Sequence, residues 1–230
     1  MTLWLHSCCN NIYRISKEKH MLVNRPCAYC GSKIIERSKG HVLPRSMYPD
    51  SLPNAKRITV AECLDCKKIW EDAEPHFKNV LMAIWNSDAL PSDSRVESMW
   101  RGYREKDGQR RAKELLALIE QTQANGKKRE MIYPAKDVKF NLILRRIVRG
   151  LCNEHDLGTS ISDERVFCDV MLWSIPPAFE ADFTWHRIAD DFFQYAYSRP
   201  NDESMHSFWL LRFSRNLLFF GTVANESSKA

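Results

Sequence analysis

The sequence predicts an α+β protein in which a small zinc-binding module precedes several helices and a short antiparallel sheet. Two CxxC pairs, Cys27/Cys30 and Cys63/Cys66, have the spacing of ligands to one metal ion. Apolar residues then recur with a helical period along the middle of the chain. After Gly158, short aromatic and aliphatic runs alternate with turn residues, which is typical of antiparallel strands.

Size and composition place the chain among ordinary globular proteins. Its 230 residues, of which 44% are hydrophobic and 27% charged, suffice for one sizeable domain or for a small module with a companion. The net charge of +5 is compatible with a polyanionic partner but does not single one out. No apolar run approaches the roughly 20 residues that span a bilayer, so we expect no membrane association.

Three regions follow from the local pattern. Residues 1–21 show no sustained period and end at Met21, so we expect a flexible tail or a misassigned start. Residues 22–90 are predicted to form the zinc-binding module. A polar break at 91–94 marks the boundary to a C-terminal α+β domain of unknown role, residues 91–230.

The four paired cysteines are the strongest signal. The turn of each CxxC pair aims two thiolates at one point, and two such pairs complete the tetrahedral sulfur shell that structural zinc prefers. Cysteines in metal-type pairs favour a reducing cytoplasm over a disulfide framework. Cys152 and Cys168 lie in apolar surroundings and are expected to be ordinary buried thiols.

Within the module, residues 33–45 are predicted to form a short hairpin that carries His41, and residues 57–60 a return strand. A helix is predicted over 73–85, with Asp72 as its N-cap and Pro75 in its first turn, where a missing N–H costs little. Its buried face would consist of Phe77, Val80, Leu81 and Ile84.

Beyond the module, the pattern predicts helices over 106–123 and 136–152. The second helix would bury Phe140, Ile143, Leu144, Ile147 and Leu151. Its arginines, Arg145, Arg146 and Arg149, would line the polar side. Four strands are expected over 166–173, 192–197, 208–213 and 217–223.

The module resembles the zinc-containing HNH endonucleases of bacteria. The likeness covers residues 25–85 and rests on four segments: 27–31 (CAYCG), 41–49 (HVLPRSMYP), 58–66 (ITVAECLDC) and 74–77 (EPHF). A weaker likeness begins at 149–151. The resemblance implies a ββα-metal fold, His41 as the general base that activates water, and DNA as the substrate of a hydrolytic cut.

Two positions depart from the family pattern. The resemblance implies that the residue before the histidine and the residue after the last cysteine hold a divalent ion, magnesium or manganese, but these are Gly40 and Lys67 here. Asp72, Glu74 and His76 are the candidate replacements, because Asp72 and His76 stand four apart on one helix face and Glu74 lies where the family is acidic.

Basic residues crowd the same module and point to phosphate contacts. The candidate nucleic-acid ligands are Lys39, Arg45, Lys56, Arg57, Lys67 and Lys68. An ordinary solvated surface is the alternative. The same two interpretations apply to Arg101, Arg104, Arg110 and Arg111 with Trp100 and Tyr103, for which a solvated face is favoured.

Three functions therefore stay open. The first is an HNH endonuclease that binds and cleaves DNA. The second is an inactive, zinc-stabilised module that binds nucleic acid or a protein, in which case the C-terminal domain offers a surface for a protein partner. The third places the activity in the C-terminal domain, although no catalytic triad or phosphate-binding glycine loop supports it.

Overall fold

The computed structural model describes residues 25–34, 39–48, 57–85, 101–124, 127–132, 136–171, 175–181, 183–188, 192–213 and 217–226. It is a mixed helix and sheet structure, which confirms the predicted α+β class. The predictions for residues 1–21, for the polar break at 91–94 and for Lys56 lie outside the described residues.

The N-terminal part is a two-stranded antiparallel sheet followed by two helices. Strand β1 (Lys39–His41) pairs with β2 (Thr59–Ala61), and the short 3-10 helix η1 (Arg45–Met47) lies between them in the chain. Helices α2 (Leu64–Glu71) and α3 (Ala73–Trp85) follow. The return strand predicted over 57–60 is present as β2, and it pairs with the strand that carries His41.

Helix α2 was not predicted, and it changes the role of Asp72. Cys63 caps the start of α2, because its sulfur accepts from the backbone N–H of Cys66. Asp72 has helical backbone angles and ends α2 as its C-cap, so its predicted role as the N-cap of α3 is wrong. The range of α3 and its buried face are as predicted: Phe77, Val80 and Leu81 are fully buried and Ile84 partly.

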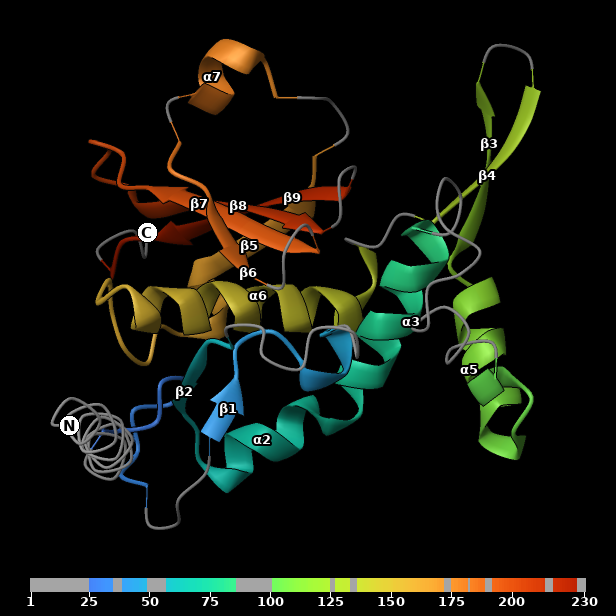
Figure 1. Ribbon diagram of the computed structural model, residues 1–230, viewed down its shortest axis with the longest axis horizontal. Helices are drawn as coiled ribbons and strands as arrows, with labels where there is room; N and C mark the ends of the chain where they lie inside the picture. The colour runs from blue at the N-terminus through green and yellow to red at the C-terminus, as the bar shows by residue number, and fades with distance from the viewer. Residues whose placement is uncertain are drawn as a thin grey trace, which may run out of the picture.

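The predicted helix over 106–123 is too long. Helix α5 (Lys106–Leu116) ends early, and β3 (Ile119–Ala124) pairs with β4 (Lys127–Ile132) in a hairpin that extends away from the body in Figure 1. Asn125-Gly126 joins the two strands, and this dipeptide strongly favours a two-residue hairpin turn. That turn signal outweighs the helical period.

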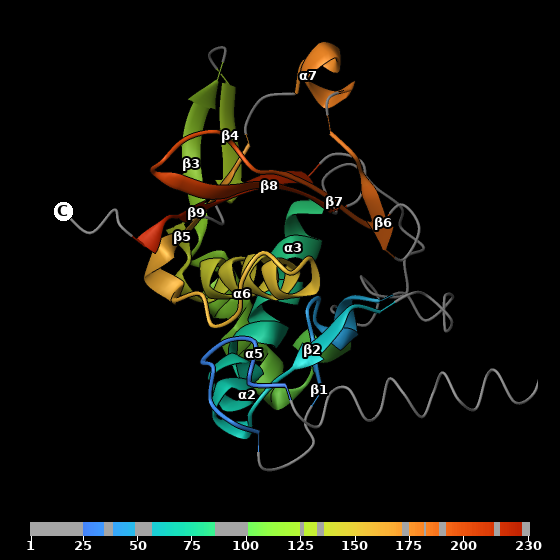
Figure 2. The same cartoon turned by 90° about the vertical axis from the view of Figure 1, so that its left-hand side faces the viewer.

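Helix α6 (Val138–Glu154) is the centre of the molecule. It starts at Asp137, whose carboxylate accepts from the N–H of Phe140 at 2.6 Å. It contacts α3 and β2 on one side and the sheet strands β5 and β9 on the other, and the two views agree on this layering (Figures 1 and 2). All five residues of its predicted stripe are fully buried: Phe140, Ile143, Leu144, Ile147 and Leu151.

The C-terminal sheet has five antiparallel strands where four were predicted. Its order is β5-β9-β8-β7-β6, with β5 Val166–Val170, β6 His186–Ile188, β7 Phe193–Ser198, β8 Met205–Phe213 and β9 Leu217–Ala224. The missed strand, β6, has only three residues. The 3-10 helix η3 (Asp163–Arg165) precedes β5, and α7 (Pro177–Ala181) stands apart from the sheet in Figure 1.

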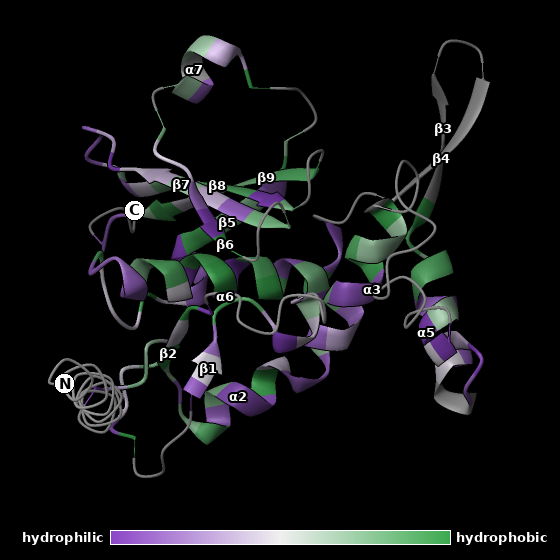
Figure 3. Ribbon diagram, in the orientation of Figure 1, coloured by the Kyte–Doolittle hydropathy of each residue, from purple (hydrophilic) through white to green (hydrophobic). Residues whose placement is uncertain are grey.

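One buried cluster joins residues from both sides of the predicted boundary at residue 90. It runs from Cys27 and Leu43 through Phe77 and Leu81 to Phe140 and Phe219. Green, hydrophobic bands accordingly occur on α6, on α3 and on strands of the sheet in Figure 3. Cys152 and Cys168 lie in this cluster, as predicted for buried thiols. No described helix is long and apolar enough to cross a membrane.

Candidate functional site

The four paired cysteines meet at one point. The sulfur atoms of Cys27, Cys30, Cys63 and Cys66 all lie within 4.8 Å of one another. Those of Cys30 and Cys63 are 3.6 Å apart, close to the separation of about 3.8 Å that follows from tetrahedral Zn–S bonds of about 2.3 Å. A disulfide requires about 2.05 Å, so these thiols are free and arranged to hold a metal ion.

Electrostatics of the four thiols fit a bound cation. Burial opposes ionisation of Cys30, yet hydrogen bonds with Ser32 and neighbouring thiols outweigh it and lower its pKa to about 6. Burial and the nearby sulfurs raise the pKa of Cys66. Four such groups ionise together only when a metal ion balances their charge. The cysteine cluster can therefore hold a metal ion.

A second chain segment holds the first cysteine loop in place. Arg149 of α6 donates from Nη2 to the carbonyl of Tyr29 and from Nε to the carbonyl of Ile161. The N–H of Ser160 donates to the carbonyl of Ala28 at 2.9 Å. Arg149 is 7% exposed, so its predicted position on the polar side of the helix is wrong. The cysteine loop rests on α6 and on the segment after it.

His41 ends β1 and is half-buried, with its ring 6.5 Å from that of Tyr48 in an edge-on arrangement. Its Nδ1 is buried and has no hydrogen-bond partner among the described residues. Burial lowers the pKa of His41, and four nearby cations, Arg57, Arg45, Arg146 and Lys39, lower it further. The imidazole is therefore neutral near pH 7 and surrounded by positive charge.

The carboxylate of Glu62 fills the space next to Gly40. A Cβ built on Gly40 would stand 2.5 Å from Oε2 of Glu62 and 2.9 Å from its Cβ. Glu62 is 1% exposed and accepts a hydrogen bond of 2.8 Å from the indole of Trp70. An acidic group thus stands beside the residue that precedes His41, and it comes from the residue that follows β2. The only sequence signal for it was an acidic residue inside the 58–66 segment.

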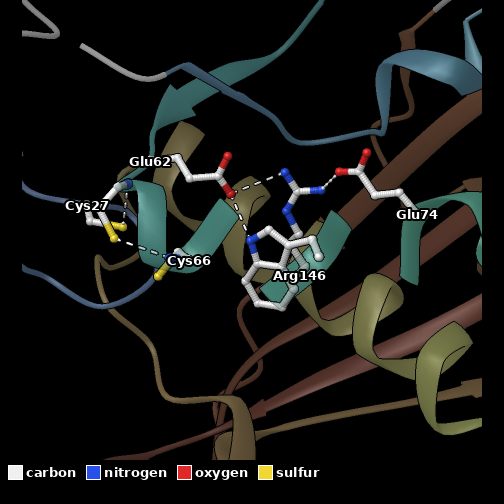
Figure 4. A network of polar contacts seen from close by, with 7 residues as sticks. Cys27, Glu62, Cys66, Glu74 and Arg146 are labelled. Carbon is white, nitrogen blue, oxygen red and sulfur yellow. Dashed lines mark hydrogen bonds and ion pairs between the residues drawn. The ribbon is translucent and has the colours of Figure 1, made fainter. Parts of the chain in front are cut away.

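Arg146 lies between two carboxylates (Figure 4). Its Nη2 donates to Oε1 of Glu62 at 3.3 Å and its Nη1 to Oε1 of Glu74 at 2.5 Å. The rings of Tyr29 and Trp70 lie 5.6 and 5.4 Å from the guanidinium carbon. Arg146 is 2% exposed, so it does not line the polar side of α6 as predicted. A fixed cation from the C-terminal part thus stands beside His41.

The three candidate metal ligands from α3 and its start do not assemble. Glu74 is bound to Arg146, and Nε2 of His76 lies 3.0 Å from Oδ2 of Asp137. Asp72 is exposed at the end of α2. Across the described ranges, the four cysteines are the only group of three or more His, Cys, Asp or Glu side chains close enough to share an ion.

The predicted phosphate ligands divide into two sets. Lys39 and Arg45 are exposed beside His41, and the guanidinium of Arg57 lies 5.3 Å from the centre of the Tyr48 ring. Nε of Arg57 is buried without a hydrogen-bond partner in the described part of the chain. Lys67 and Lys68 are exposed on α2, and neither is among the charges that act most strongly on His41.

No protein-family model, curated protein or solved structure matched this chain in the three comparisons. The likeness to HNH endonucleases therefore stays a prediction from the sequence. Function has to be inferred from the side chains around the cysteines, His41 and Arg146.

Proposed function

We propose that the protein binds nucleic acid, with DNA as the first candidate, on the positively charged surface of the β1–β2 hairpin. A zinc ion held by the four cysteines would stabilise the hairpin without taking part in chemistry. The observation that carries this proposal is the set of four cations around His41: Lys39, Arg45, Arg57 and Arg146.

Charge at this site favours a phosphate over a divalent cation. The carboxylates of Glu62 and Glu74 already share the guanidinium of Arg146. Lys39, Arg45 and Arg57 remain as positive charge at or near the surface. Such side chains bind a nucleic-acid backbone because they release its condensed counterions, which is a sequence-independent contribution.

Phosphodiester hydrolysis by the HNH route is the second candidate function, and one observation supports it. His41 is neutral and its Nδ1 is unpaired among the described residues, which are properties of a general base. The route also needs a metal ion at the scissile phosphate, and in this structure the carboxylates of Glu62 and Glu74 hold an arginine. Binding without cutting is therefore the proposed activity. Free thiols for zinc would fit a reducing compartment such as the cytoplasm.

The test is a binding titration with labelled duplex DNA, single-stranded DNA and RNA at several salt concentrations. Affinity should fall linearly with salt on logarithmic axes, as expected when phosphates are neutralised. The double variant Arg45→Gln/Arg57→Gln should bind every sequence more weakly and show a shallower salt slope. The matched control is Arg187→Gln/Arg199→Gln, which removes two exposed arginines from the C-terminal half.

Four results would overturn the proposal. The first is an affinity that does not change with salt, and the second is an equal loss of affinity in both double variants. The third is nicking of plasmid DNA that requires manganese or magnesium and disappears in His41→Ala, because the protein would then be an endonuclease. The fourth is absence of any nucleic-acid binding, which would favour a protein partner.

A further inference from the structure

A second basic site lies beside the hairpin, in a cavity of about 480 Å³ between η1, α3 and the start of α5. Ser46 lines it from η1, Lys78 and Asn79 from α3, and Arg101, Tyr103 and Arg111 from the C-terminal side. The cavity contains none of the metal-binding cysteines and neither His41 nor Arg146. Its volume is in the range of about 300–1,000 Å³ that is typical of sites for small organic ligands.

The lining is positively charged. Among the described lining residues, Lys78, Arg101 and Arg111 are basic and only Glu105 is acidic. Arg101 and Arg111 are exposed and form no ion pair within the described part of the chain, whereas their neighbour Arg110 is paired with Glu114 at 2.7 Å. Two of the cations are therefore available to an anionic ligand, and guanidinium groups match the geometry of phosphate oxygens.

An aromatic residue completes the site. Tyr103 is half-buried, and burial raises its pKa while the nearby Arg111 acts in the opposite direction. The phenol ring and the guanidinium are thus neighbours in one cavity. Ser46 and Asn79 add polar groups for hydrogen bonds. A flat ring next to cations is an arrangement that binds a nucleobase together with its phosphate.

We propose that this cavity binds a nucleoside monophosphate, either free or as one unpaired nucleotide of a strand. Arg101, Arg111 and Lys78 contact the phosphate, and Tyr103 contacts the base. Ser46 directly follows Arg45, so a strand on the hairpin can continue into the cavity. In its strand form the inference rests on the function proposed above, whereas in its free-nucleotide form it stands alone.

The experiment measures binding of adenosine monophosphate and of adenosine to the full chain by calorimetry. Saturable binding of the monophosphate is expected, with far weaker binding of adenosine. Arg101→Gln/Arg111→Gln should lower the affinity for the monophosphate at least about tenfold, because each charged hydrogen bond contributes about that factor or more. Arg104→Gln/Arg110→Gln is the matched control: it makes the same charge change at exposed arginines that do not line the cavity, and affinity should change by less than about twofold.

Tyr103→Leu separates the two contacts. It should weaken binding of the monophosphate, whereas inorganic phosphate should compete for the cavity as it does in the wild-type protein. The inference is overturned if the wild-type protein shows no saturable binding at millimolar monophosphate, or if both arginine pairs lose affinity equally. It is also overturned if Arg45→Gln/Arg57→Gln abolishes monophosphate binding, because the ligand would then occupy the hairpin.

The same variants distinguish this inference from the proposed function. Monophosphate binding without any binding of oligonucleotides would contradict the proposed function and leave the cavity site standing. The opposite outcome is salt-sensitive oligonucleotide binding that the cavity variants do not affect, together with no monophosphate binding. It would contradict the cavity site and leave the proposed function standing.

Discussion

The guanidinium of Arg146 donates to the carboxylate of Glu62 across 84 positions of sequence. The pair joins α6 to the end of β2, and Glu74 binds the same guanidinium from α3. Both members of the Arg146–Glu62 pair are 2% or less exposed. A buried cation from the C-terminal half of the chain therefore neutralises a carboxylate that lies next to the hairpin.

Arg146→Met should lower the free energy of unfolding by about 3–5 kcal/mol, because it leaves the buried carboxylate of Glu62 without its charged partner. Adding Glu62→Gln should recover part of the loss, since position 62 then carries no unpaired charge. Urea unfolding measures both. Arg145→Met is the control: its ion pair with Asp163 is partly exposed, so it should cost about 1 kcal/mol or less. Equal losses for Arg145→Met and Arg146→Met would contradict the prediction.

Gly40→Ala should destabilise the protein by about 1–3 kcal/mol, because the new Cβ would overlap Glu62. Gly102→Ala is the matched control, since nothing lies within 4 Å of a Cβ at that position. Thermal unfolding compares the two. Gly40→Asp should be worse than Gly40→Ala, because it forces a second carboxylate against Glu62, and it should not create a metal site. A Gly40→Ala protein as stable as Gly102→Ala would show that Glu62 moves aside freely.

Purified protein should contain about one zinc per chain, because the four sulfurs match one tetrahedral site. Elemental analysis measures this. Cys63→Ser should lose the metal and unfold the hairpin region, since ligation is linked to folding. Cys152→Ser removes a buried thiol outside the group of four cysteines, so this variant should keep the zinc ion. Wild-type protein free of zinc, or equal metal loss in both variants, would argue against the site.

The pKa of His41, followed by NMR, should lie below the ordinary value of 6.5, because burial and four cations disfavour the imidazolium ion. Arg57→Gln should raise that pKa, whereas Arg187→Gln should leave it unchanged. Because the folded state then takes up its proton at lower pH than the unfolded state, stability should decrease as the pH falls below 6.5. A midpoint above 6.5 in the free protein would mean that the cations do not face the ring.

Asp137 should contribute stability that disappears in acid. Burial opposes its charge, but hydrogen bonds with His76 and with the N–H of Phe140 outweigh burial and lower its pKa. The contribution is therefore complete above the unfolded value of 3.8 and is lost as the pH falls through the lower folded value. Unfolding of wild type and Asp137→Asn should differ most above about pH 4. A difference independent of pH would assign the effect to helix capping alone.

Local patterns in the sequence were sufficient to predict the cysteine cluster, helices α3 and α6, and four strands of the sheet. Each of these rests on spacing within a few turns or strands, where periodicity reports burial directly. The CxxC pairs add a spacing that is typical of metal ligands, and the structure brings all four sulfurs together. Local periodicity and spacing do not report contacts between residues that are distant in sequence.

Arg146 illustrates that limit. An arginine on a helix is ordinarily solvated, and its burial here depends on carboxylates 84 and 72 positions away, which no local period reports. Helix α2 was missed for a different reason. Of its eight residues only Cys66 and Trp70 are buried, so it has almost no apolar stripe and is defined by the cap at Cys63. Cys63, one of the four clustered cysteines, thus contributes to the formation of α2.

The contact between Arg149 and the carbonyl of Tyr29 spans 120 positions, and it has a consequence for synthesis on the ribosome. The loop with the first cysteine pair emerges early, but the helix on which it rests emerges only after residue 149 has been made. Contacts at such separations form slowly, because the intervening chain must first be ordered. We therefore expect the nascent cysteines to stay exposed to metal exchange and oxidation until the C-terminal half arrives, so that zinc is retained late in synthesis.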